Sequence, residues 1–400
     1  AGAGATTHFG FETVPEADKA HVAQGKIHSP LGSYKGELIF ATHSGHYKTR
    51  HLLPDGETVA KPYKGGYVFA VDKRTGKGRI VAAPLHDRPV TVPFDKGVPM
   101  LGEALISTAL DAERGLFYAL SWPSAIFIKV DLDTGKVSEY GRMQDGGESV
   151  PRHLPPKEPA EGKKKRRRGP VNPKYQQILR TLAMDDEGNV YGASGYGTIW
   201  KYDREADEVV HMKSRMECAT ASEQVKKRPA WLNTWRTIVW DDEQKAFYGV
   251  HWATSWLFRF DPKADRIEPV IEWAPAKRRV KDYAQIGLDM GPDRVLYGLV
   301  HTPPIKGGVQ RSVHLLTLDL KAGRFKDHGN VLGENGMTLM FAETCEAAPN
   351  GDVYSAAWME IPADRRKDVM KRRAEGGVPE VRYPFIMSLI RIPGERIRLD

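Results

Sequence analysis

The stretch from Leu179 to Asp203, LRTLAMDDEGNVYGASGYGTIWKYD, decides the fold of this 400-residue chain. An apolar run ends in Asp-Asp-Glu-Gly, and a second run, Asn189 to Ala193, leads into a glycine-rich loop. A third run, Ile199 to Tyr202, ends at Asp203. Short runs of β-forming residues separated by turn residues are typical of consecutive strands. The stretch therefore predicts three strands of one antiparallel sheet.

The same pattern recurs along the chain. Close versions are Ser107 to Asp131, Thr237 to Asp261 and Ile286 to Asp319, and looser ones are Glu37 to Asp72 and Phe341 to Ile392. A turn such as DLDTGK and a fourth short run, as at Val209 to Met212, follow the third strand. Self-similarity at a spacing of roughly 40 to 60 residues indicates a radial repeat. We predict an all-β fold, a β-propeller of four-stranded blades, with six units legible and seven possible.

A repeat array that closes on itself is one domain whatever its length, so we expect residues 1–400 to form a single propeller domain. Two insertions interrupt the repeats: a basic, proline-rich one at about 146–177, which contains GKKKRRRGP, and a charged one at about 361–380. The basic run resembles a nucleic-acid patch. A single short cluster without interleaved aromatic residues is more typical of a solvated loop, so we expect no nucleic-acid partner.

Composition and motifs limit the other classes. The chain has no apolar run of membrane-spanning length, and its first residues, AGAGATTHFG, lack a signal-peptide pattern. We expect a monomer without membrane association, secreted or periplasmic, whose export signal has been removed. Cys218 and Cys345 leave one disulfide or two buried thiols open. The net charge of +8 permits an anionic partner without choosing a polysaccharide, a nucleic acid or a cell surface.

Blade topology predicts which face carries the functional side chains. The loop between the second and third strands lies on the same face as the start of the first strand. The six loops on that face contain THSGHY, SWPS, SGYG, HWATS, HTPP and AWME, and every one has a His, Tyr or Trp. Loops on the other face read DDEGN, DDEQK and DAERG, which are ordinary turn residues. Because loops on a rigid scaffold carry binding and catalytic groups, the aromatic face is the predicted site.

The candidate site residues form two groups. The predicted catalytic residues are His43, Tyr47, Tyr196 and His251, and the predicted substrate-binding residues are Arg180, Arg236, Trp235, Trp252, Trp122, His301 and Glu343. A plainer interpretation stands beside this one, since tryptophans near strand ends often pack between blades. Imidazoles from several blades, with Glu343 or Glu103, would also suit a divalent metal such as calcium, zinc or manganese. No local metal-binding motif is present, and no other cofactor is predicted.

The repeat pattern, with its VYGAS-like second strand and IWKYD-like third strand, resembles the broad superfamily of bacterial propellers that includes gluconolactonases and virginiamycin lyase. The stretch KIHSPLGSYKGELIFATHSGHY also resembles a group of secreted bacterial propeller proteins. Gluconolactonase-like members hold a divalent metal with acidic and amide side chains, whereas the corresponding positions here include Arg180, Arg236 and Gln285. The residue types resemble instead those of propeller polysaccharide lyases such as ulvan lyases. That resemblance implies His and Tyr for proton transfer and Arg for a uronate carboxylate.

We therefore expect a carbohydrate-active enzyme that cleaves an acidic, uronate-containing polysaccharide or oligosaccharide by β-elimination. An arginine would stabilise the enolate-like charge, and His or Tyr side chains would move the protons. Trp252 or Trp235 would stack on a sugar ring. Two alternatives stay open. One is a glycoside hydrolase with two carboxylates drawn from Glu103, Glu343, Glu346 and Glu360. The other is a propeller that binds a glycan or a protein without turnover.

Overall fold

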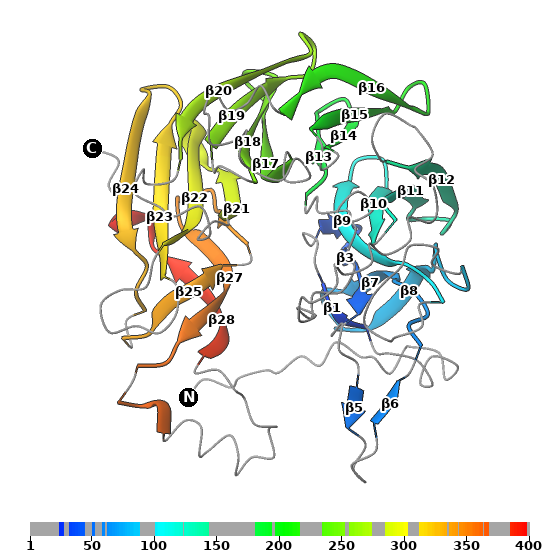
Figure 1. Ribbon diagram of the computed structural model, residues 1–400, viewed down its shortest axis with the longest axis horizontal. Coiled ribbons are helices and arrows are strands. Elements are labelled where there is room, and N and C mark those ends of the chain that lie inside the picture. The colour runs from blue at the N-terminus through cyan, green and yellow to red at the C-terminus, as the bar shows by residue number, and fades with distance from the viewer. Residues whose placement is uncertain are drawn as a thin grey trace, which may run out of the picture. The chain divides into compact units, whose positions relative to one another are not determined.

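A computed structural model gives the structure of the chain (Figure 1). It describes residues 24–27, 32–44, 50–52, 58–60, 62–88, 101–122, 124–143, 181–193, 197–216, 234–252, 256–273, 285–302, 312–333, 336–342, 344–362, 364–367 and 385–397. The chain divides into two compact units, Ala1–Lys213 and Ser214–Asp400. The prediction of a single domain stays a prediction.

The described residues form six four-stranded antiparallel sheets, the blades of a β-propeller, with almost no helix. The predicted fold class is therefore confirmed, and the six legible units are the six blades. Each blade follows the order read from the sequence, because strands that are consecutive in a repeat pair with each other. Within the first unit β3 lies beside β9, and within the second β17 lies beside β21 (Figure 1).

The first unit contains three blades. The first blade consists of β2 (Gly32–Tyr34), β3 (Glu37–Ala41), β7 (Val68–Asp72) and β8 (Gly78–Ala82). The second consists of β9 (Ala104–Asp111), β10 (Leu116–Trp122), β11 (Ile126–Asp131) and β12 (Val137–Arg142), and the third of β13 (Ala183–Met184), β14 (Val190–Ala193), β15 (Thr198–Asp203) and β16 (Glu208–Arg215). Two further pairs are β1 (Gln24–Lys26) with β4 (His43–Ser44), and β5 (Arg50–Leu52) with β6 (Thr58–Ala60).

The second unit contains the other three blades. The fourth blade consists of β17 (Trp235–Asp241), β18 (Ala246–His251), β19 (Trp256–Asp261) and β20 (Arg266–Glu272), and the fifth of β21 (Gln285–Met290), β22 (Val295–Thr302), β23 (Ser312–Asp319) and β24 (Arg324–Asn330). In the sixth, β25 (Thr338–Ala342) and β26 (Glu346–Ala347) pair with successive parts of β27 (Val353–Glu360), which also pairs with β28 (Phe385–Ile392).

An aspartate at the end of the third strand fixes the turn to the fourth. Asp72 Oδ1 accepts hydrogen bonds from the backbone N–H groups of Arg74 (2.9 Å) and Thr75 (2.6 Å). Gly76 follows at φ +69°, a conformation that glycine adopts without steric cost. Asp131 makes the same turn in the second blade. These contacts explain why DKRTGK and DLDTGK recur in the sequence.

Apolar side chains fill the space between neighbouring blades. Between the first and second blades, Ile39 and Val68 lie in one cluster with Phe117 and Ile128. Small residues in second strands make room for aromatic rings of the third strands. A Cβ added to Gly192 would lie 2.0 Å from the ring of Trp200, so no larger residue fits there without movement.

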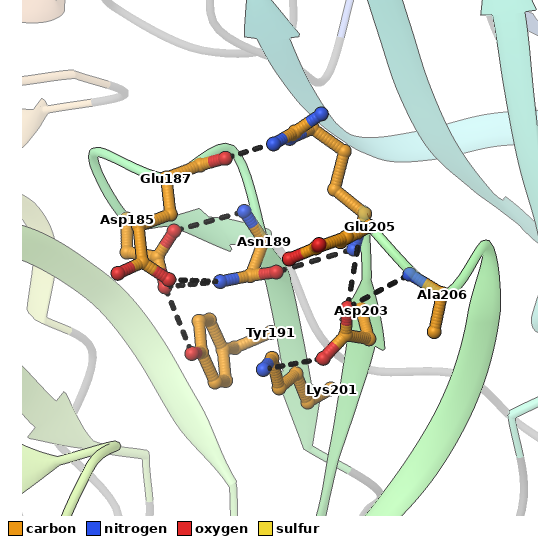
Figure 2. A network of polar contacts seen from close by, with 9 residues as sticks. Asp185, Glu187, Asn189, Tyr191, Lys201, Asp203, Glu205 and Ala206 are labelled. Atoms are coloured by element: carbon orange, nitrogen blue, oxygen red, sulfur yellow. Dashed lines mark hydrogen bonds and ion pairs between the residues drawn. The ribbon is translucent and has the colours of Figure 1, made fainter.

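The acidic turns on the face opposite the predicted site have structural partners. Asp185, at the end of the first strand of the third blade, accepts hydrogen bonds from the Asn189 side chain and the Tyr191 hydroxyl, both at 2.9 Å (Figure 2). In the second unit Asp241, which is 2% exposed, binds Arg294 of the next blade at 2.6 Å. The sequence predicted local turn residues here, and the contacts extend their role to bonds between blades.

Several expectations fall on other parts of the chain. The basic insertion at 146–177 lies outside the described residues, and so does most of the charged one at 361–380. Cys345 is a buried free thiol, and Cys218 lies outside the described residues. In the part of the chain that the structure describes, no helix is long and apolar enough to span a membrane.

Candidate functional site at the loop ends of the blades

Strand pairing defines one end of each blade, called here the loop end. Trp235, the first residue of β17, pairs with His251, the last residue of β18. In the second blade Ala104 pairs with Trp122 in the same way. The start of the first strand and the end of the second therefore lie together, as the topology predicted.

The register shows which loop-end residues are equivalent. The residues opposite the third-strand aspartates Asp72, Asp131 and Asp319 are Glu37, Leu116 and Val295. Counted from those pairs, one position is occupied by His43, Trp122, Trp252 and His301, and the position before it by Thr42, Ser121, His251 and Val300. His43 and His251 are thus successive positions rather than equivalent ones.

The aromatic position packs against the neighbouring blade. His43 has no exposed surface and its ring lies 5.4 Å from that of Trp122, which is 4% exposed. His301 is 1% exposed, with its ring 4.7 Å from that of Phe341 in the sixth blade. The ring of Phe341 lies 5.5 Å from that of Trp358, and both side chains are half-buried. These contacts favour a packing role for His43, Trp122 and His301, the plainer of the two interpretations.

Two more candidates in the fourth blade are buried. Trp235 has no exposed surface, and its ring lies 6.5 Å from that of Phe258. His251, opposite Trp235 in the pair of strands, also has no exposed surface. The functional roles predicted for these residues stay predictions, and any direct contact with a ligand requires side chains above them to move.

Arg236 lies at a β-bulge, a position that carries an uncharged residue in other blades. Trp235 pairs with His251 and Thr237 with Val250, so Arg236 is the extra residue between them. The second and fifth blades have the same register shift, at Ile106 and Ile286. A bulge re-aims the side chain of the inserted residue. Of these three equivalent positions only that of the fourth blade carries a charge.

The Arg236 guanidinium lies over the indole ring of Trp252, with 4.8 Å between Cζ and the ring centroid. Both side chains are half-buried at the loop end. A cation–π contact of this kind stabilises a guanidinium over the face of an aromatic ring. The guanidinium of Arg236 offers two N–H donors to a carboxylate, and the indole of Trp252 offers a flat apolar face of the size of a sugar ring.

The remaining candidates are not brought together by the described structure. Tyr47, Tyr196, Arg180 and Glu343 lie outside the described residues. Of the acids considered for a hydrolase, Glu360 is bound to Arg366 at 2.6 Å and Glu346 is exposed. No group of three or more His, Cys, Asp or Glu side chains within the described ranges is placed to hold a metal ion.

Sequence reasoning missed the bulge at Arg236 and undervalued Glu103. The bulge leaves no mark in the sequence, because WRTIVWD reads as a regular strand. The sequence places Glu103 near the start of a first strand and predicts a metal ligand or a hydrolase acid there. It is 3% exposed and accepts hydrogen bonds from the Ser121 hydroxyl and from the Ser124 N–H (3.1 Å).

Comparison with known proteins identifies no family for the chain. No family model and no curated protein matches the sequence. Among solved structures, the chain is similar to a protein of unknown function from Bacteroides thetaiotaomicron, with 11% identity, a TM-score of 0.45, and coverage of 83% of this chain and 67% of that one. It is also similar to a protein from Lactobacillus plantarum, with 10% identity, a TM-score of 0.49, and coverage of 94% and 87%.

Proposed function

We propose that this β-propeller acts on acidic, uronate-containing saccharides and binds them at the loop end of the fourth blade. The observation that carries the proposal is the Arg236–Trp252 pair, a cation held on an indole at a bulge whose equivalents in two other blades are isoleucines. The net charge of +8 is consistent with an anionic ligand.

A uronate offers one partner to each member of the pair. Its carboxylate can accept two parallel hydrogen bonds from the guanidinium of Arg236, the strongest arrangement for this type of contact. The apolar face of the sugar ring can lie against the part of Trp252 that the arginine leaves uncovered. A neutral sugar satisfies only the second contact, so the pair discriminates in favour of an acidic ligand.

The reaction that suits these contacts is β-elimination. A base removes the hydrogen on the carbon next to the carboxylate, the bond to the glycosidic oxygen breaks, and a carbon–carbon double bond forms. The leaving oxygen takes up a proton. Negative charge develops on the carboxylate, where Arg236 would stabilise it more strongly than in the ground state. His251, next to Trp252 in the chain, is the nearest predicted proton-transfer residue along the sequence.

Binding without turnover is the second candidate, and one observation favours it. His43 and His251, the two predicted proton-transfer residues that the structure describes, have no exposed surface. A general base must come within hydrogen-bond reach of the proton that it removes. If these side chains keep their buried positions, the same loop end recognises an acidic glycan and does not cleave it.

A turnover assay separates the two candidates. The protein is incubated with polygalacturonate, alginate and a glucuronate-containing polymer, and the ultraviolet absorbance of unsaturated sugar is followed. β-Elimination predicts a rising signal with at least one polymer and loss of that signal in His251→Ala with little change in affinity. Binding of a polymer without any signal would contradict elimination and support recognition alone.

A further inference from the structure

Hydroxyl groups at the ends of the second strands form a second polar arrangement in the first unit. In the first blade the Thr42 hydroxyl accepts the Tyr67 N–H (2.8 Å) and donates to Gln24 Oε1 (2.9 Å). In the second blade the Ser121 hydroxyl accepts the Ile126 N–H (2.9 Å) and donates to a carboxylate oxygen of Glu103. Each hydroxyl thus joins the start of the third strand to a polar side chain, which lies on β1 in one case and next to the start of β9 in the other.

Gln24 is fully bonded within the protein. Its Oε1 accepts from the hydroxyls of Thr42 and Tyr63 (3.0 Å), and its Nε2 donates to the Gly65 carbonyl (2.7 Å). The side chain is 7% exposed, and its amide leaves no hydrogen-bonding atom unused for a structural role. A neutral amide is therefore sufficient to make these contacts.

Glu103 differs from Gln24 in the contacts of one side-chain atom, Oε1. Both of its bonds, from Ser121 and Ser124, go to Oε2, and among the described residues Oε1 has no hydrogen-bond partner and no basic side chain. The Ser121 oxygen already accepts the Ile126 N–H, so its own proton is directed to Oε2. Oε2 therefore accepts from two donors, and Oε1 is the oxygen that remains for a further donor.

We propose that Glu103 is a ligand-binding residue whose Oε1 meets a hydroxyl group of a bound saccharide at the loop end of the second blade. A buried carboxylate without a counter-charge is costly unless a further donor completes it. A saccharide hydroxyl supplies that donor to Oε1. The saccharide as ligand rests on the proposed function, whereas the role of Oε1 rests on the contacts of Glu103.

The surroundings of Glu103 agree with this role. Trp122 pairs with Ala104, the residue next to Glu103, and the ring of His43 packs on Trp122. The carboxyl thus lies beside two of the predicted site residues. Because Oε2 already accepts two hydrogen bonds, Oε1 is the oxygen of this carboxyl that is left for a ligand.

The test compares Glu103→Gln with wild type, using isothermal titration with two probes, tetragalacturonate and the neutral cellotetraose. Both probes carry hydroxyls, so the variant should weaken both by about tenfold or more, the loss expected for one hydrogen bond to a charged group. The matched control is Glu113→Gln, which removes the same charge from a side chain that is 85% exposed at the other end of the blade.

Thermal unfolding of the same variants tests whether a loss of affinity comes from a loss of stability. Since an amide, that of Gln24, accepts the corresponding hydroxyl of Thr42, Glu103→Gln should keep the wild-type melting temperature, whereas Glu103→Ala should lower it. Unchanged affinity for both probes in Glu103→Gln, or a melting temperature as low as that of Glu103→Ala, would overturn the inference while leaving the proposed function in place.

Three further outcomes are distinguishable. Loss in Glu103→Gln together with equal effects of Arg236→Ala on both probes would support Glu103 and contradict the acidic-sugar proposal. If wild type binds neither probe, both proposals are wrong. A rise in melting temperature with calcium or zinc alone, absent in Glu103→Gln, would replace the saccharide with a metal ion.

Discussion

Asp289→Asn should stabilise the second unit at neutral pH and not at low pH. Asp289 lies on β21, where Oδ2 accepts the Ala347 N–H of the sixth blade at 2.8 Å. Burial raises the pKa of this carboxyl from 3.8 to about 6, and the neighbouring Glu346 adds to the rise. The folded state therefore favours the protonated form, in contrast with most aspartates.

The direction and size of the change in stability follow from the pKa values of Asp289 in the unfolded and folded states. A raised folded pKa gives stability that is fully present below 3.8 and is lost as the pH rises through about 6. The difference of about 2 units, at about 1.36 kcal/mol each, corresponds to about 3 kcal/mol as an upper bound. Asparagine keeps a carbonyl oxygen for the Ala347 N–H and never ionises. The substitution therefore removes the pH-dependent loss of stability.

The assay is urea unfolding of wild type and Asp289→Asn at several pH values between about 4 and 8. The free energy of unfolding of the variant, relative to wild type, should increase by up to about 3 kcal/mol over that range. Asp242→Asn, whose side chain is 78% exposed, is the matched control and should show no such increase. A difference that stays constant with pH, or that falls as pH rises, would refute the assignment of a raised pKa to this half-buried carboxyl.

Two further predictions concern the contacts between strands and blades. Arg294→Ala leaves the buried Asp241 without its partner and should cost about 3 kcal/mol or more in urea unfolding, whereas Arg324→Ala, which removes a 57% exposed arginine, should cost less than about 1 kcal/mol. Gly192→Ala places a Cβ against the Trp200 ring and should lower the melting temperature, and Gly192→Ala combined with Trp200→Phe should recover part of the loss if that ring is the obstacle. Equal costs for the two arginines, or a harmless Gly192→Ala, would contradict the respective contact.

The fold could be predicted because each blade repeats a local signal. The third-strand aspartate and the glycine of the following turn are determined by nearby backbone, so Asp72 and Gly76 indicate the same turn wherever they recur. The loop end could also be predicted, since Trp235 and His251 are placed by strand order alone. Partners between blades could not, because Arg294 and Asp241 are distant in sequence.

The roles within the site were harder to predict, for a geometric reason. A shift of one residue along a strand moves a side chain to the other face. His43 and His251 look alike in THSG and HWAT, yet the register places them at successive positions, with His43 where other blades have tryptophan. The bulge that sets Arg236 apart depends on pairing with β18 and has no sequence signature. The contacts of Glu103 depend on strand pairing with the segment around Ser121, so they too have no sequence signature.

The central claim, that Arg236 and Trp252 select an acidic saccharide, is tested most directly by titrating tetragalacturonate and cellotetraose into wild type, Arg236→Ala and Arg236→Lys. We predict that Arg236→Ala weakens tetragalacturonate at least about tenfold, the size of a charge-assisted hydrogen bond, and changes cellotetraose little. Arg236→Lys should recover part of the loss, since a point charge cannot reproduce the planar fork. Arg266→Ala, which removes a 61% exposed arginine from the other end of the blade, should bind both probes as wild type does. Equal losses on the two probes, or no loss in Arg236→Ala, would contradict the claim.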